Sequence, residues 1–142
     1  MKAFEACFLP DTFIQRADET KISISDVQIG DVLLSITSLG EIVTTIVEHV
    51  FIHEVNEYIE VQLGQNQLRV TREHPFFIRN GNFCSLDKLR LFDCVYSLID
   101  GNLQPTSITS IKTMKAPGTC VYNLRTTQPH TYFANRIAVH KC

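Results

Sequence analysis

The sequence predicts a single all-β domain built from many short strands. Short segments rich in β-branched and aromatic residues recur along the chain, and Gly, Asn, Asp and Pro stand between them. No long amphipathic helical pattern occurs. The 142 residues, of which 44% are hydrophobic and 20% charged, are sufficient for one domain with a sizeable core.

The expected elements follow one another with turn residues between them. The expected strands cover residues 21–27, 41–53, 56–63, 67–71, 106–114 and 120–126. Turn chemistry marks residues 10–12, 28–31, 39–41, 63–67, 79–82, 99–102, 116–118 and 127–130. The pairs Asn80-Gly81 and Asp100-Gly101 are typical of tight hairpin turns. One short helical piece is expected within residues 85–91.

The chain also repeats itself once. "VQIGDVLLS" at residues 27–35 resembles "LRLFDCVYS" at 89–97. Two later pairs follow at nearly the same spacing: residues 43–46 with 108–111, and 58–61 with 121–124. A long unit that occurs only twice predicts two β-subdomains related by a pseudo-twofold axis rather than a solenoid. Chance similarity among β-rich segments is the alternative.

Charge and hydropathy exclude several classes of partner. The formal net charge of -2 leaves no basic excess to neutralise a phosphate backbone, so no nucleic-acid partner is expected. The apolar runs are too short and too interrupted to span a bilayer, and "MKAFEA" lacks the apolar stretch of a signal peptide. We therefore expect a soluble monomer without a membrane partner.

The cysteines and histidines predict neither a disulfide framework nor a dedicated metal site. Five cysteines are an odd number without a CxxC pair, and the five histidines lack an HExxH arrangement, so no cofactor is expected. Three of the cysteines, Cys84, Cys94 and Cys120, are expected to pack in the core.

Cys7 is the first candidate for chemistry. It stands near the start of the chain, just before a "PDT" turn. Its thiolate can attack the carbonyl of the peptide bond that precedes it, Ala6–Cys7, which would make the protein its own substrate. The alternative is a small apolar residue that fills the first strand.

The segment "VTREHPFFI" supplies groups that such an attack needs. Thr71 and His74 lie at an expected strand end, where Pro75 stops regular pairing. His74 can protonate the leaving nitrogen, while Thr71 or nearby backbone N–H groups hold the oxyanion. A turn histidine without a role is the alternative, because T-x-x-H is a common pattern.

The last segment predicts a β-hairpin that carries two histidines. It consists of a strand, a turn at Gln128-Pro129, a second strand that opens at His130, and a polar turn at Asn135-Arg136 that leads to His140. By itself this is a hairpin with two incidental histidines.

Together these blocks resemble the Hint superfamily, which comprises inteins, Hedgehog autoprocessing domains and bacterial intein-like domains. The resemblance rests on the "C-x-x-x-D-T" turn, the "T-R-E-H" block and the closing "V-Y-N-L…H-T-Y-F-A-N-R-I-A-V-H" block, in this order from Cys7 to Cys142. The chain is most similar to the bacterial intein-like domains, because it has no room for an inserted endonuclease or a sterol-recognition region. The resemblance implies a horseshoe-shaped all-β Hint fold with a pseudo-twofold duplication, and a bacterial protein whose location is set by its host protein.

The resemblance implies an autocatalytic, single-turnover reaction on the protein's own flanking polypeptides (exteins). Cys7 would convert the Ala6–Cys7 amide into a thioester by an N-to-S acyl shift, and Thr71 and His74 would activate that bond. The domain would span residues 7–141, with residues 1–6 as a remnant of the upstream flank.

The downstream junction follows from the same resemblance. His130 would act there, and His140 would be the penultimate histidine that assists cleavage. Cys142 would be the first residue after the domain and the acceptor of the upstream segment by transthioesterification.

Two positions depart from the pattern of splicing members. Lys141 stands where those members carry the Asn that cyclises to a succinimide, and a protonated lysine amine cannot form that imide. Asn123 stands where they often carry Asp, so it can donate or accept hydrogen bonds but cannot act as a base. We therefore expect N-terminal cleavage or transfer without full splicing, whether Lys141 is native or a substitution that keeps the precursor whole.

Other functions stay open from the residues alone. A metal-binding β-module could use thiols and imidazoles at the same centre: Cys7, Cys142, His74 and His140. A protein-interaction domain that only keeps the fold is a second alternative. A disulfide between Cys7 and Cys142 is a third.

Overall fold

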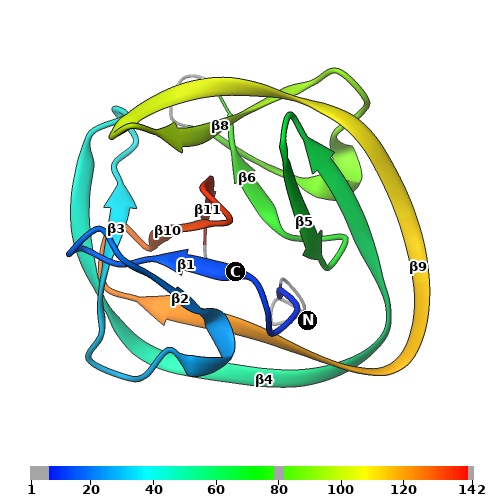
Figure 1. Cartoon of the computed structure of the whole chain (residues 1–142), viewed down its shortest axis with the longest axis horizontal. Coiled ribbons are helices and arrows are strands. Elements are labelled where there is room, and N and C mark those ends of the chain that lie inside the picture. The colour runs from blue at the N-terminus through cyan, green and yellow to red at the C-terminus, as the bar shows by residue number, and fades with distance from the viewer. Residues whose placement is uncertain (1–6, 79–81, 141–142) are drawn as a thin grey trace.

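The computed structural model describes residues 7–78 and 82–140, which form an all-β domain as predicted. The described strands make one eleven-stranded sheet that curls into a ring (Figure 1). No helix in the described part of the chain is long and apolar enough to cross a membrane. The elements are β1 (Phe13–Gln15), β2 (Lys21–Ser23), η2 (Ile24–Asp26), β3 (Val32–Ile36), β4 (Ile42–Leu63), β5 (Asn66–Val70), β6 (Pro75–Phe77), β7 (Phe83–Ser85), η4 (Leu86–Lys88), β8 (Cys94–Ile99), β9 (Asn102–Thr126), β10 (Thr131–Ala134) and β11 (Ile137–His140).

Two strands are far longer than the sequence predicts, and they form the outer wall. β4 has 22 residues and β9 has 25, and the two pair antiparallel along most of their length. Figure 1 shows both strands running round the periphery of the ring. The predicted break at residues 116–118 is wrong. Gly118, with φ of 78°, lies where the register shifts between Val55 and Glu57, so the irregularity bends β9 without ending it.

The inner strands bring the two ends of the described chain together. The path through the sheet runs β2-β1-β10-β11-β8-β9-β4-β3, and β6 pairs with β11. β1, near the chain start, is therefore a neighbour of the C-terminal hairpin β10–β11. The main core lies within this ring and includes the fully buried Phe8, Phe76 and Tyr132.

The internal duplication is visible in matching hydrogen bonds. In the first half, the Gln28 N–H donates to Asp31 Oδ2 at 2.9 Å. In the second half, the Arg90 N–H donates to Asp93 Oδ2 at 2.8 Å. Each turn leads into a hairpin of one short and one long strand, β3–β4 and β8–β9, so the predicted pseudo-twofold relation is confirmed.

The backbone bonds also correct the register of one predicted repeat pair. The Gly30 N–H donates to the Val47 carbonyl at 2.9 Å, and the Phe92 N–H donates to the Ile108 carbonyl at 2.7 Å. Ile108 is therefore the counterpart of Val47. Residues 108–111 correspond to 47–50 and not to 43–46.

The local elements agree with the sequence at some points only. The turn at Asp100-Gly101 is confirmed, with φ of 52° and 79° between the paired residues Ile99 and Asn102. The expected helical piece in residues 85–91 is the single turn η4, whereas the strand expected at 21–27 ends where η2 begins. Asn80-Gly81 lies outside the described residues.

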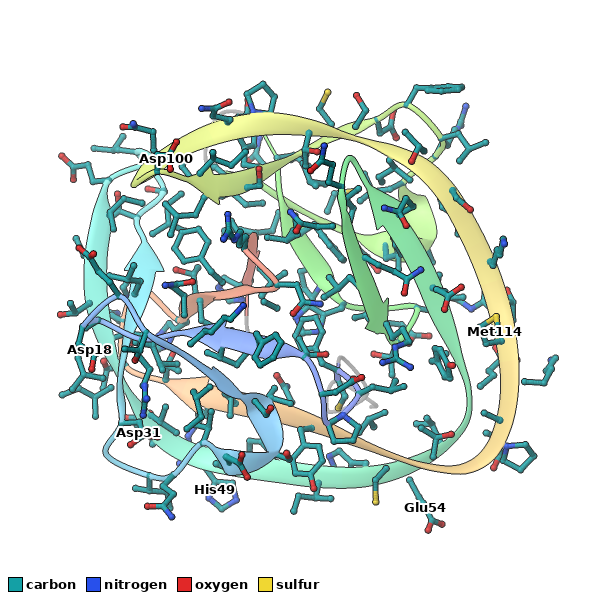
Figure 2. All side chains as sticks on the ribbon, in the orientation of Figure 1. Asp18, Asp31, His49, Glu54, Asp100 and Met114 are labelled. Carbon is teal, nitrogen blue, oxygen red and sulfur yellow. The ribbon has the colours of Figure 1, made fainter. Side chains whose placement is uncertain are left out.

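The expectation that three cysteines pack in the core is wrong. Cys84 is half-buried, and Cys94 and Cys120 are exposed. Cys120 lies across from Glu54, which is also exposed and points away from the ring (Figure 2). Residues of a long two-stranded wall alternate between its faces, so a cysteine at such a position faces water.

Candidate active site

Cys7 lies between the end of β5 and the second half of β9. The next residue, Phe8, forms a β-bridge to each of these strands. The Phe8 N–H donates to the Tyr122 carbonyl at 2.8 Å, and the Tyr122 N–H donates to the Phe8 carbonyl at 2.7 Å. The antiparallel register therefore sets Cys7 across from Thr71 on one side and Asn123 on the other. The thiol residue is fully buried.

Two hydrogen bonds join Cys7 to Thr71. The Cys7 N–H donates to Thr71 Oγ1 at 2.7 Å, and the Thr71 N–H donates to the Cys7 carbonyl at 2.8 Å. The nitrogen of Cys7 is also the nitrogen of the peptide bond that precedes it. The Thr71 hydroxyl thus contacts the nitrogen side of that bond, whereas the sequence suggested the oxyanion side.

His74 is held by backbone bonds on both of its sides. Its N–H donates to the Thr71 carbonyl at 3.3 Å, and its carbonyl accepts from the Leu86 N–H at 3.0 Å. The imidazole is fully buried, and its centroid lies 4.2 Å from that of the Phe8 ring. The T-x-x-H segment therefore forms a turn that places an imidazole beside the residue after Cys7.

A cavity of about 320 Å³ opens beside Cys7. Its lining comes from residues 53–59 in the middle of β4, from residues 71–73 and from Cys7 itself. His53 is the imidazole of this lining, and its cross-strand partner Val121 packs against Cys7. His74 is not among the described residues that line the cavity.

An ion network borders this cavity. Glu57 accepts a hydrogen bond from Lys115 Nζ at 2.7 Å and another from Arg72 Nη2 at 2.9 Å. These charged donors, Lys115 first and Arg72 second, hold the pKa of the Glu57 carboxyl below its ordinary value of 4.5. The network ties β4 and β9 to the segment that carries Thr71.

Asn123 is engaged by the C-terminal hairpin. It is buried, and its Oδ1 accepts from the Tyr132 hydroxyl at 3.0 Å and from the Leu124 N–H at 2.9 Å. Tyr132 belongs to β10 and packs edge-on against Phe8, with centroids 6.2 Å apart. Tyr132 therefore connects β9, β10 and the segment that begins with Cys7.

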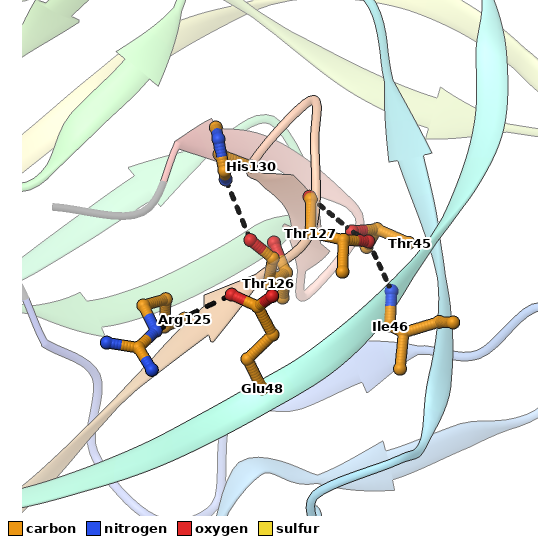
Figure 3. Close-up of polar contacts among 7 residues, drawn as sticks. All are labelled: Thr45, Ile46, Glu48, Arg125, Thr126, Thr127 and His130. Atoms are coloured by element: carbon orange, nitrogen blue, oxygen red, sulfur yellow. Dashed lines mark hydrogen bonds and ion pairs between the residues drawn. The ribbon is translucent and has the colours of Figure 1, made fainter.

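His130 lies on a turn that is anchored to β4 (Figure 3). Thr127 Oγ1 accepts from the Ile46 N–H at 3.0 Å, and the Thr45 hydroxyl donates to the Thr127 carbonyl at 2.6 Å. His130 Nδ1 lies 2.7 Å from the Thr126 carbonyl. Because a carbonyl oxygen only accepts, Nδ1 is the donor in this contact.

His140 ends β11 beside His130. The two imidazole centroids are 6.3 Å apart, and the His140 centroid is 4.7 Å from that of Phe83. β11 pairs with β6 at Val139 and Phe76, so the next step along the two strands sets His140 across from Pro75, the residue after His74. The structure therefore gathers the described candidates in one region: Cys7, Thr71, His74, Asn123, His130 and His140.

The comparison with protein families agrees with this arrangement. A family model described as the pretoxin HINT domain matches residues 13–141. The chain belongs to the pretoxin HINT domain family. Cys7 lies before the matched residues. A search of curated proteins finds no significant match.

Solved structures show the same fold for the HINT domain. A bacterial intein-like domain from Clostridium thermocellum matches with a TM-score of 0.85 and 24% identity, over 95% of this chain and 98% of that one. A DnaB intein from Synechocystis sp. PCC 6803 matches with a TM-score of 0.85 and 21% identity, over 96% and 99%. The two solved structures show that the HINT domain has the fold of inteins and intein-like domains.

Several predicted features of the HINT domain fall outside the described residues. These are Ala6, Lys141 and Cys142, so the Cys7–Cys142 disulfide and one ligand of the metal alternative lie there as well. Among residues 7–78 and 82–140, no group of three or more His, Cys, Asp or Glu side chains is placed to hold a metal ion.

Sequence reasoning missed two residues of the HINT domain site. His53 lies within a β-branched strand segment, and nothing in its local pattern sets it apart from His49. Tyr132 belongs to the "HTYF" block, but its link to Asn123 depends on how β9 and β10 meet. Both assignments need the three-dimensional register of the long strands.

Proposed function

We propose that this HINT domain performs an N-to-S acyl shift at the Ala6–Cys7 bond. Cys7 Sγ attacks the Ala6 carbonyl carbon, the C–N bond breaks, and the nitrogen takes up a proton to become the α-amine of Cys7. The acyl group then stands on sulfur as a thioester. The observation that supports this most strongly is the 2.7 Å hydrogen bond between the Cys7 nitrogen and Thr71 Oγ1.

Thr71 and His74 act on the leaving nitrogen in this proposal. The amide nitrogen must lose its resonance and become pyramidal before it can leave. The Thr71 hydroxyl accepts its N–H and can rotate to donate to the lone pair that appears on the nitrogen. His74, buried close by, supplies the proton. Both groups are buried away from water. Hydrogen bonds are electrostatically stronger in the protein interior than in water.

The thioester is then resolved without full splicing. The acyl group passes to Cys142 or to an external nucleophile. Lys141 cannot form the cyclic imide that would release the downstream flank. His130 and His140, whose rings lie 6.3 Å apart, act at the downstream junction when a residue able to cyclise stands there.

The test uses the domain between two different folded proteins. Dithiothreitol should release the N-terminal partner from the parent, because a small thiol captures the thioester. Cys7→Ala should release none. Cys94→Ala, which removes an exposed thiol, should behave like the parent. Equal release from the parent and Cys7→Ala would contradict the proposal.

A further inference from the structure

We propose that His53 is the general base for the external nucleophile that resolves the Cys7 thioester, and that this nucleophile enters through the cavity beside Cys7. The inference rests on the proposed acyl shift and adds a residue and an entry route to it. The acceptor it implies is water or a small primary amine that carries its own proton to be removed.

The strand geometry directs His53 toward Cys7. His53 pairs with Val121, and residues directly opposite in an antiparallel pair face the same side of the sheet. Val121 packs with Cys7 and Leu9 in a small cluster that also contacts Val55, two residues after His53. Glu54, the intervening residue, is exposed and points away from the ring (Figure 2). His53 therefore faces the nucleophile.

The cavity offers space where the reaction needs it. Its volume of about 320 Å³ is far more than one water molecule requires, so a small amine also fits. Cys7 and His53 both line it. An acceptor that enters here meets the acyl group on sulfur and an imidazole in the same space, as general-base catalysis requires.

The other titratable groups of the cavity fit the role less well. Those that line it with His53 are Cys7, Glu54, Glu57, Tyr58, Arg72 and Glu73. Glu57 is engaged by Lys115 and Arg72, which lower its pKa and make it a weaker base. Glu54 and Glu73 are exposed carboxylates. An imidazole is the side chain that most often serves as a general base in enzymes.

His74 is placed for the first step and not for this one. Phe8, on which the His74 ring packs, belongs to the main core, whereas Cys7 belongs to the small cluster on the cavity side. Successive residues of an extended segment face opposite sides. The two imidazoles thus divide the reaction: His74 protonates the leaving nitrogen, and His53 deprotonates the acceptor.

The step balances without any further reactant. The lone pair of the acceptor attacks the thioester carbonyl carbon while His53 takes the acceptor's proton. The tetrahedral intermediate then collapses, the C–S bond breaks, and the Cys7 thiolate regains the proton from the imidazolium. The products are the N-terminal partner as an acid or amide and the free Cys7 thiol.

The experiment separates formation of the thioester from its resolution. The flanked domain is followed in buffer alone, in glycinamide and in dithiothreitol, for the parent, His53→Ala and His53→Gln. Release in dithiothreitol should stay within about twofold of the parent, because a thiolate needs no base. Release by water and by glycinamide should fall roughly 10²-fold. Added imidazole should restore part of it in His53→Ala.

The matched control is His49→Ala, which removes an exposed imidazole from the same strand outside the cavity. It should change none of the three rates. Equal loss in dithiothreitol and in water for both His53 variants, or no loss in water, would overturn the inference while leaving the acyl shift intact. Absence of release by dithiothreitol from the parent would overturn the proposed function and this inference with it.

Discussion

The contact between Cys7 and Thr71 is the most informative detail at the scale of single residues. The Thr71 hydroxyl is buried and accepts from the backbone nitrogen of Cys7 at 2.7 Å. A side chain that only filled space would not need a hydroxyl here, and a hydroxyl at the leaving nitrogen matches the chemistry of amide cleavage. The hydroxyl of Thr71 can be removed with little change in the shape of the side chain.

Thr71→Val should slow the formation of the thioester. The isosteric change removes the acceptor and leaves the buried Cys7 N–H without it, at a cost in stability of about 1 to 3 kcal/mol. We expect the rate of dithiothreitol-induced release to fall roughly 10²-fold, as for other single groups that act on a reacting bond. Ser97→Ala removes another buried hydroxyl and is the control. If both variants slowed release equally, stability and not chemistry would explain the effect of Thr71.

Lys141→Asn should bring back cleavage at the downstream junction. The change supplies a carboxamide that can cyclise, and in the proposed function His140, at the end of β11, and His130, whose ring lies 6.3 Å away, assist it. Adding His140→Ala should lower the rate of this cleavage at least about 10-fold. Mass spectrometry of the released C-terminal partner measures the cleavage rate of Lys141→Asn with and without His140→Ala. Cleavage in Lys141→Asn that does not depend on His140 would contradict the assigned role.

The positions of the candidate residues were predictable from the sequence where a short motif carries them. Cys7, Thr71 and His74 stand in blocks whose order along the chain is specific, and the fold brings them together. The side of the bond that Thr71 contacts was not predictable, because it depends on the register between residue 7 and the end of β5. His53 was missed for the same reason, since its place on the Cys7 side of the sheet depends on its pairing with Val121.

At the scale of elements, the Glu57 network lies at the bend of the long strands. Glu57 lies in β4 at the register shift, and its two partners come from β9 and from the segment after β5. All three side chains are partly exposed, so each ion pair contributes little by itself. Together they link the wall of the cavity to the segment that carries Thr71.

The Glu57 network should make a small, pH-dependent contribution to stability. The folded-state pKa of Glu57 is below its ordinary value, so the contribution is present above pH 4.5 and is lost as the pH falls through the folded-state pKa. Glu57→Gln should lower Tm by roughly a degree or two at pH 7. The difference from the parent should shrink in acid. Thermal melts between neutral and acidic pH check this, and a Tm difference that grew in acid would contradict it.

Strand positions were predictable from the sequence, but strand continuity was not. Segments 41–53 and 56–63 both have strand character, yet they are one strand, β4. Local propensity predicts that the strand ends at the turn residues 116–118. In the structure β9 continues through this irregularity, because it pairs with β4 on both sides of it. The wrong prediction that Cys94 and Cys120 are buried has the same cause, because the pairing of the strands decides which face of the sheet each residue lies on.

At the scale of the whole molecule, the duplication sets the architecture. Both halves use a carboxylate that closes a turn, a short strand and a long strand, and the long strands then pair with each other. The sequence repeat predicted this arrangement, although one of its three pairs was out of register. The closure of the ring around the C-terminal hairpin was not predictable from local patterns.

Asp31→Ala and Asp93→Ala should have similar effects, because the two carboxylates play equivalent roles in the two halves. Each change removes a hydrogen bond to a turn N–H and should cost about 0.5 to 1.5 kcal/mol. The exposed Asp26→Ala serves as the control. Urea unfolding of the three variants gives the comparison. A loss confined to one half would contradict the equivalence of the two turns.

Intact-mass spectrometry tests most directly whether Cys7 carries the upstream polypeptide as a thioester. The flanked domain is treated with dithiothreitol, and both released fragments are weighed. We expect an N-terminal fragment that ends at Ala6 and carries one dithiothreitol as a thioester, together with a domain that begins at Cys7. Neither should form in Cys7→Ala. A fragment cut at any other bond, or the same fragments from Cys7→Ala, would contradict the acyl shift at Cys7.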